Sequence, residues 1–237
     1  MIKKLFRVSR FIHKWAGLFL ALQILLWILG GVVMSVIPLD KVHGDHLATK
    51  VLTSTPDNSQ HLYSIDTLRL NIIAPITNIA YTQILDEPYY AFKTVEGDKL
   101  FHALTGDPFD TITSVQAIQI AQQHYLGDGE IASHSLLDKA PREASRNVGP
   151  IWQVQFDDTW NTTLYISPKT GTLTTIRSDL WRIFDFFWML HIMDYDEREN
   201  FNNPILITFS ISALLFTLTG IVLLFKSFKI SGKTKRT

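Results

Sequence analysis

The sequence contains no cysteine in its 237 residues. This absence excludes disulfide bonds, thiolate-bound zinc, iron–sulfur clusters, covalently attached c-type haem and cysteine nucleophiles. The dinucleotide and phosphate-binding motifs Gly-x-Gly-x-x-Gly and Gly-x-x-x-x-Gly-Lys-Ser/Thr are also absent, so nothing indicates a flavin, nicotinamide or other nucleotide site. Redox chemistry would therefore need a cofactor held by histidine or by non-covalent contacts.

Acidic residues are absent from both ends of the chain. All 22 Asp and Glu residues lie between Asp40 and Glu199, whereas five of the 22 Lys and Arg residues precede Asp40 and five follow Glu199. The formal net charge of zero is thus the sum of two basic ends and a middle part with a charge of −10.

Two uncharged runs of 25 residues lie just inside the basic ends, at 15–39 and 201–225. About 20 apolar residues cross the hydrocarbon core of a bilayer, so both runs predict transmembrane helices. Short loops rich in Lys and Arg stay in the cytoplasm. We therefore expect a multi-pass membrane protein with both termini cytoplasmic and the acidic middle part on the other side. If the source is a Gram-negative bacterium, the membrane is the inner membrane and the middle part lies in the periplasm.

A signal peptide is the alternative interpretation of the first apolar run. Its length exceeds the usual 7–15 residues of such a segment, and no Ala-x-Ala-like cleavage site follows it. We expect an uncleaved anchor.

The middle part reads as two similar units, at about 62–110 and 111–178, after a linker at 40–60. Each unit starts with a capped helix, continues in antiparallel strands and ends in a turn, at Thr105-Gly106 and Thr170-Gly171. The pattern predicts an extracytoplasmic domain of helices and antiparallel strands, with the order of a tandem repeat. The predicted fold class is membrane α+β, with this segmentation: basic tail 1–11, transmembrane helix 12–38, periplasmic domain 39–178, amphipathic interfacial helix 179–200, transmembrane helix 201–225 and basic tail 226–237.

Five segments resemble one known family. IWQVQF and TTLYISPKTGTL, within 151–173, resemble the strand–hairpin–Thr-Gly signature of the PepSY domain, and SVQAIQIAQQHY at 114–125 resembles its helix. RFIHKWAGLFLALQILLWILGGVVM at 10–34 is similar to the first helix of PepSY-associated transmembrane proteins, and FFWMLHIMDY at 186–195 is similar to a Leu-His segment of that family. The larger members have four spans, whereas this chain has two. The resemblance implies haem b and ferric reduction.

Of the eight histidines, only His13 belongs to the cytoplasmic end of a predicted span. Gly17 lies one turn further on the same side of the helix. His-x-x-x-Gly suits an axial ligand beside a flat macrocycle, but a histidine next to Lys14 and Trp15 also fits an ordinary interfacial anchor. The family resemblance favours the haem ligand. Because each chain offers one histidine there, a bis-histidine haem implies a homodimer.

A second candidate ligand, His191, belongs to an aromatic stripe. Trp181, Phe184, Trp188 and His191 follow helical spacing. They fit either an amphipathic helix on the outer membrane surface or an axial histidine within an aromatic wall. His46 is a further candidate for the outer haem site.

The segment His43-Gly-Asp-His46 is also a weak candidate for metal binding. Two acidic clusters, at 157–158 and 194–199, fit either solvated faces or attraction of hard cations such as ferric iron. Neither pattern is specific by itself.

Together these features predict an inner-membrane haem-b protein that reduces periplasmic ferric iron and so supports ferrous iron uptake. The expected partners are the membrane, a second copy of the chain, a quinol donor and a ferrous iron transporter, and no nucleic acid. Two alternatives remain: a non-enzymatic, membrane-anchored PepSY binding or regulatory module, and a metal-binding accessory protein.

Overall fold

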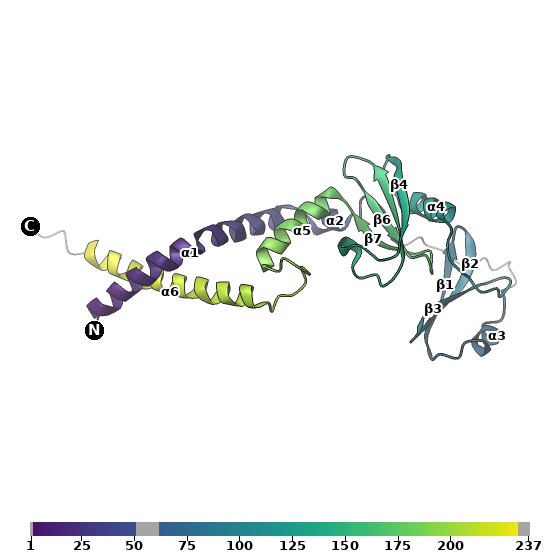
Figure 1. Cartoon of the computed structure of the whole chain (residues 1–237), viewed down its shortest axis with the longest axis horizontal. Coiled ribbons are helices and arrows are strands. Elements are labelled where there is room, and N and C mark those ends of the chain that lie inside the picture. Colours follow the sequence, from purple (N-terminus) through teal and green to yellow (C-terminus); the bar gives the residue numbers. More distant parts are fainter. Residues whose placement is uncertain (1, 51–61, 232–237) are drawn as a thin grey trace, which may run out of the picture. The chain divides into compact units, whose positions relative to one another are not determined.

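The computed structural model describes residues 2–50 and 62–231 and shows an α+β protein (Figure 1). Two long apolar helices flank a domain of two antiparallel sheets. The chain divides into a helical unit, Met1–Pro38 with Ile183–Thr237, and a sheet unit, Leu39–Arg182. The second part of the expected linker, 51–60, and the end of the expected basic tail, 232–237, lie outside the described residues.

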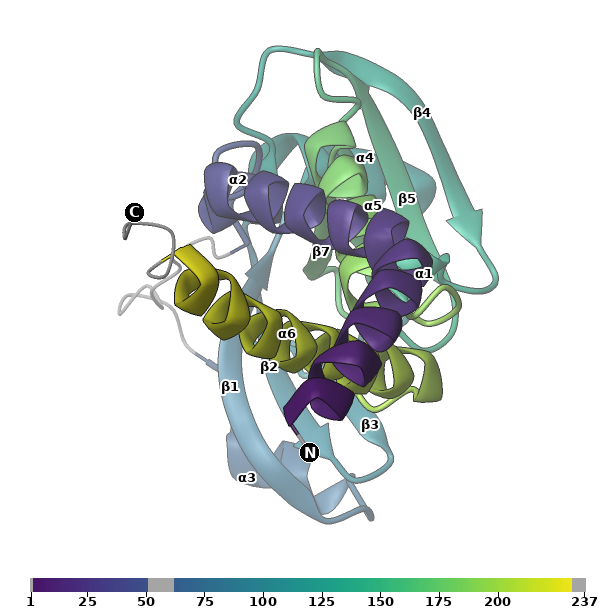
Figure 2. The same cartoon turned by 90° about the vertical axis from the view of Figure 1, so that its left-hand side faces the viewer.

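The helical unit consists mainly of α1 (Ile2–Val36) and α6 (Pro204–Ser231), which lie against each other (Figure 2). The first helix begins at Ile2, so the residues expected as a basic tail are helical as well. Leu20, which is 1 % exposed, and Ser9 are buried in α1. Within these helices, Lys4–Val36 and Pro204–Phe225 are long and apolar enough to cross a membrane.

The shorter helix α5 (Asp179–Ile192) begins in the sheet unit and continues into the helical unit. It ends earlier than the expected bound at residue 200, because Met193 adopts a φ of 53°, in the left-handed region. The following loop is held by Asn203, whose side-chain amide donates to the carbonyl of Ile192 and whose Oδ1 accepts the N–H of Leu206 at the start of α6. Pro204 then occupies the first helical position, where its missing N–H costs nothing.

The sheet unit contains two meanders, each preceded by a capped helix. In the first, α3 (Ile65–Leu70) is capped by Ser64, and in the second, α4 (Ser114–His124) is capped by Thr113 in a capping box with Gln116. The first sheet has the order β1 (Ile76–Ile84), β2 (Glu87–Thr94), β3 (Gly97–His102). The second has the order β4 (Glu130–Leu137), β5 (Ile151–Asp157), β6 (Thr163–Ile166), β7 (Leu173–Arg177).

Two short helices were not expected from the sequence: α2 (Leu39–His43), at the start of the expected linker, and the 3₁₀ turn η1 (Arg142–Ala144). The main core lies between α4 and the second sheet, with Val154 and Leu164 fully buried. Ile84 of β1 belongs to the same core, so the end of the first sheet is tied to the second. A smaller core around Phe92 and Leu68 joins α3 to the first sheet.

The two Thr-Gly turns have a common backbone requirement. Gly106 and Gly171 have φ values of 80° and 63°, which are strained for any other residue. A Cβ on Gly106 would lie 2.9 Å from the ring of Tyr63, and one on Gly171 would lie 3.0 Å from Ile84 Cγ2. Both turns therefore need glycine for its φ and for its lack of a side chain.

Candidate functional site

The imidazole of His13 in α1 is held against α6. Its Nδ1 lies 3.1 Å from the carbonyl oxygen of Phe216 and 3.2 Å from Oγ1 of Thr219. Its ring is stacked on that of Phe216, with the centroids 4.1 Å apart and an interplanar angle of 7°. Both the ring plane and the direction of Nδ1 are thus fixed by α6.

These contacts define which nitrogen of His13 carries the proton. A carbonyl oxygen only accepts hydrogen bonds, so Nδ1 is the donor. In the neutral ring, Nε2 then carries the lone pair. Histidines that ligate metals usually donate their other ring N–H to a carbonyl or carboxylate in this way. His13 therefore has the second contact typical of an axial ligand.

The glycines near His13 serve to bring α1 and α6 together. A Cβ on Gly220 of α6 would lie 3.0 Å from His13 Cε1, and one on Gly17 would lie 2.9 Å from Phe216 Cε2. The space beside Gly17 is therefore filled by the ring of Phe216. The geometry of His13 fits the role of a haem ligand. Gly17 does not fit its expected role, because it borders a phenyl ring and not an open space for a macrocycle.

The second candidate, His191, lies at the end of α5 against α1. Trp27 of α1 donates its Nε1–H to the carbonyl oxygen of His191 at 2.6 Å, and Gln23 donates to the carbonyl oxygen of Leu190 at 3.4 Å. These carbonyls come from the last turn of α5, where helix carbonyls lack internal partners. A Cβ on Gly30 would lie 3.4 Å from the carbonyl oxygen of Phe187, so the lack of a side chain there lets α5 approach α1 closely.

The side chain of His191 has an unsatisfied nitrogen. Its Nδ1 is buried and has no hydrogen-bond partner among the described residues. An unpaired buried polar atom costs about 1–3 kcal/mol. A ligand, a water molecule or a second chain that supplied a partner would remove this cost.

His13 and the residue of α1 that contacts His191 lie at well-separated positions along α1. Trp27 follows His13 by 14 residues, which corresponds to about 21 Å along the helix at 1.5 Å per residue. This separation approaches the roughly 30 Å thickness of a hydrocarbon core. His13 and His191 are therefore suited to two separate sites and not to one.

The remaining candidate ligands belong to the sheet unit. His43 is exposed at the end of α2, and His46 follows in the next turn. Burial lowers the pKa of His46, and the nearby positive charge of Lys41 lowers it further. The Nδ1 atom of His46 is buried without a hydrogen-bond partner among the described residues. The described part of the chain contains no group of three or more His, Asp or Glu side chains that could hold a metal ion.

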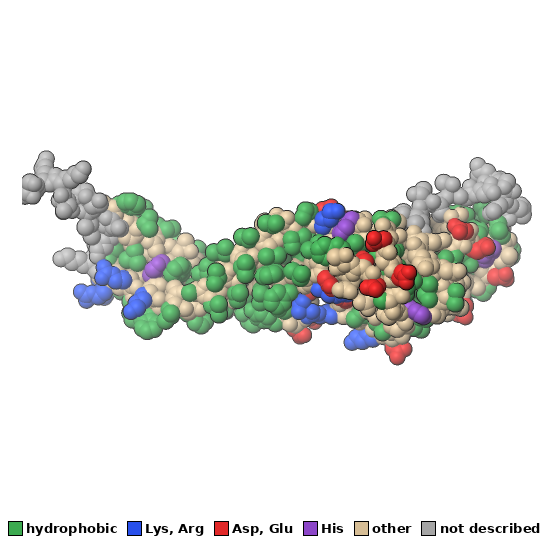
Figure 3. All heavy atoms as spheres, turned by 90° about the horizontal axis from the view of Figure 1, so that it is seen from above, with side chains coloured by type: hydrophobic (Ala, Val, Ile, Leu, Met, Phe, Trp, Pro, Cys, Tyr) green, Lys and Arg blue, Asp and Glu red, His purple; other side chains and the backbone are tan. Residues whose placement is uncertain are grey.

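Acidic side chains gather over the sheet unit (Figure 3), but two of those expected to attract cations are engaged internally. Asp158 accepts hydrogen bonds from the N–H and hydroxyl of Thr162 and from the hydroxyl of Tyr125. Asp194, in the loop after α5, accepts backbone N–H groups of residues 196, 199 and 200. These hydrogen bonds, with that of Asn200 the largest cause, lower the pKa of Asp194.

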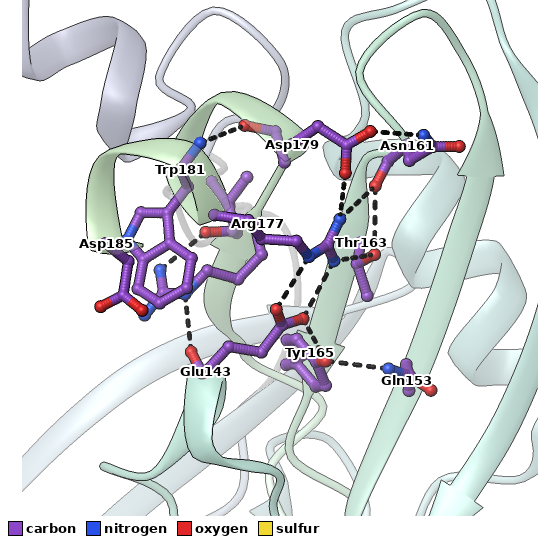
Figure 4. Close-up of polar contacts among 12 residues, drawn as sticks. Glu143, Gln153, Asn161, Thr163, Tyr165, Arg177, Asp179, Trp181 and Asp185 are labelled. Carbon is purple, nitrogen blue, oxygen red and sulfur yellow. Dashed lines mark hydrogen bonds and ion pairs between the residues drawn. The ribbon is translucent and has the colours of Figure 1, made fainter. Parts of the chain in front are cut away.

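A polar network that the sequence did not indicate lies at the start of α5 (Figure 4). Glu143 in η1 receives two hydrogen bonds from the guanidinium of Arg182, at 3.0 and 3.1 Å, and one from the hydroxyl of Tyr165 at 2.6 Å. Arg182 also donates to Asp179 and to Thr163. Burial raises the pKa of Glu143, but the hydrogen bonds from Arg182 and Tyr165 outweigh this effect and hold the pKa below its ordinary value.

This network joins residues that are far apart in the sequence, and only an i,i+3 spacing between Asp179 and Arg182 could have hinted at it. It fixes the first turn of α5 to the second sheet. Trp181 adds to this attachment, because the guanidinium of Arg177 lies 4.1 Å from its ring centroid. The expected aromatic stripe is therefore divided, with Trp181 contacting the sheet unit and Trp188 contacting Phe201 in the helical unit.

No protein-family model matches the chain, and no curated protein or solved structure matches it either.

Proposed function

We propose that the protein is a haem-b electron carrier of the bacterial inner membrane, that His13 and His191 are axial ligands, and that ferric iron outside the membrane is the electron acceptor. The observation that carries the proposal is the hydrogen bond from His13 Nδ1 to the carbonyl oxygen of Phe216. It directs the lone pair of Nε2 away from that anchor and fixes the orientation of the imidazole.

Burial supports the location in the membrane. Only 11 % of the most apolar window of α1 is buried within the molecule, and none of that of α6. A core helix of a soluble protein would be mostly buried. The apolar side chains cover these helices on their outer surfaces in Figure 3, as lipid-facing helices require.

The placement of His13 supports a functional role rather than a purely structural one. An ionisable residue within a membrane helix is costly and usually marks a functional site. Haem supplies one-electron redox chemistry when it is bound. The residues of this chain would hold its iron, orient the ligand rings and keep the site within a low-dielectric helix pair.

The proposed reaction transfers one electron to ferric iron and yields ferrous iron. A hydroquinone of the membrane is the donor class: its oxidation releases two electrons and two protons and so reduces two ferric ions. The charge of −10 between Asp40 and Glu199 favours the approach of a cation over that of nucleic acid or other anions. The resemblance to PepSY-associated proteins belongs to this proposal, together with a homodimer in which two copies of His13 share a haem.

The test is an absorption spectrum of the full chain, purified in detergent from cells with an adequate haem supply. We expect a Soret band that shifts on reduction, and reoxidation when a ferric chelate is added. His13→Ala and His191→Ala should each lower the haem content, whereas His134→Ala, at an exposed position of β4, should leave it unchanged. A chain without a Soret band would contradict the proposal and favour a membrane-anchored binding module.

A further inference from the structure

Within the part of the chain that the structure describes, the outer edge of β1 is an open edge of the first sheet (Figure 2). β1 pairs with β2 on one side, and no described residue pairs with its other side. Edge strands present unpaired N–H and C=O groups, and proteins usually protect them with charged residues or proline. β1 is nine residues long and contains neither.

The other edge strands differ in this respect. β3 carries Asp98 and Lys99, β4 carries Glu130, and β7 ends in Arg177. β3 is also partly covered, because Phe101 bridges to Pro108. Of the four edge strands in the described part of the chain, β1 alone has no charged residue.

The side chains of β1 suit a pairing on both sides. A register shift between Ile76 and Asn78 leaves the stretch from Asn78 to Ile84 in regular pairing with β2. Within it, Asn78, Ala80 and Gln83 are exposed. The hydroxyl of Thr77 donates to the carbonyl oxygen of Lys93 and so holds the irregular end of the strand.

The sequence of β1, Ile-Thr-Asn-Ile-Ala-Tyr-Thr-Gln-Ile, is self-complementary about Ala80. In an antiparallel pair of two such strands centred on this residue, Ile79 of one copy lies opposite Tyr81 of the other. Asn78 lies opposite Thr82 in the same way. Apolar side chains thus meet apolar ones, polar side chains meet polar ones, and no like charges meet.

We propose that β1 pairs antiparallel with β1 of a second copy of the chain, with a two-fold axis at Ala80. This contact joins two three-stranded sheets into one six-stranded sheet and satisfies the open edge of each. An interface of this kind is isologous, since the same segment is used by both copies.

The pairing rests on the edge of the sheet and not on the haem proposal. It would supply the second copy that a shared haem needs, but a dimer without haem would leave this inference intact. A haem protein that is monomeric would contradict this inference and the sharing of a haem by two copies of His13, but not haem binding itself.

Cross-linking tests the register directly, because the natural chain has no cysteine. Ala80→Cys places two thiols opposite each other across the axis, where Cβ atoms of a cross-strand pair are about 4.5–5.5 Å apart. Mild oxidation of the full chain in detergent should convert most of this variant to a reducible dimer. Ser135→Cys, at an exposed position of the edge strand β4, is the matched control and should form no disulfide cross-link. Equal cross-linking of both variants would contradict the proposal.

Light scattering in detergent gives a second, independent measurement. The unmodified chain should have the mass of a dimer. Ala80→Lys should convert it to a monomer, because two ammonium groups would meet at the axis, whereas Ala80→Val should remain a dimer. A monomeric unmodified chain, or a dimer that persists in Ala80→Lys, would overturn the inference.

Discussion

The ring of His13 lies flat against the ring of Phe216, with the centroids 4.1 Å apart, and its Nδ1 contacts the carbonyl oxygen of the same residue at 3.1 Å. One residue of α6 therefore fixes both the plane and the tautomer of a histidine in α1. The hydroxyl of Thr219 completes the contact, because it donates to the Phe216 carbonyl and can accept from Nδ1.

Removal of the Thr219 hydroxyl should weaken haem binding. Thr219→Val leaves Nδ1 with one acceptor and loosens the ring, and loss of such a supporting contact typically costs about 10–100-fold in affinity. The measurement is the haem content of the purified chain at limiting haem supply. Thr217→Val is the matched control, since the Thr217 hydroxyl donates only to its own helix, at the carbonyl of Ala213. Equal loss in both variants would point to a general effect on α6.

A methyl group at Gly17 should separate α1 from α6. The new Cβ would lie 2.9 Å from Phe216 Cε2, so the phenyl ring or the helix must move. Overpacking of this kind costs about 1–3 kcal/mol. Gly31→Ala is the control: nothing lies within 4 Å of its Cβ, and alanine favours helix over glycine. We expect a lower melting temperature for Gly17→Ala and an unchanged or higher one for Gly31→Ala.

Trp27 should stabilise the end of α5 through its indole N–H. Trp27→Phe retains a ring but leaves the carbonyl of His191 without its donor at 2.6 Å, with an expected loss of about 1 kcal/mol. Thermal unfolding in detergent measures the change. Trp15→Phe is the comparison, because Trp15 is 53 % exposed, and it should have little effect. If the two variants melt alike, the hydrogen bond contributes nothing measurable.

Glu143 should make stability dependent on pH in the acidic range. Its pKa is lowered in the folded protein, so the carboxylate contributes stability above its ordinary pKa of 4.5, and this contribution is lost as the pH falls through the lowered value. At neutral pH, Glu143→Gln should be less stable by about 1–3 kcal/mol, because Arg182 and Tyr165 lose the negative charge and one of the two acceptor oxygens of the side chain. The difference should shrink as the pH falls below 4.5.

Glu96→Gln serves as the control for this series, since Glu96 lies exposed in the turn between β2 and β3. Its stability should follow that of the unmodified chain at every pH. A constant gap between Glu143→Gln and the unmodified chain, down to strongly acidic pH, would show that ionisation of Glu143 does not contribute.

The sequence alone determined the elements that have a local cause. Uncharged runs at 15–39 and 201–225 required long apolar helices, and capping residues such as Thr113 marked where α4 begins. The turns at Gly106 and Gly171 were visible because glycine adopts their backbone angles with the least strain. Periodicity and turn residues act over a few positions, so they can be read without the fold.

Only the tertiary structure decided which side chains meet. The anchor of His13 comes from Phe216, which is more than 200 positions away, and that of Glu143 comes from Arg182, 39 positions away. Helical spacing placed Trp181 and His191 on one stripe, but they contact different units of the protein. Such contacts depend on how helices and sheets pack, and no local pattern in the sequence encodes the partner.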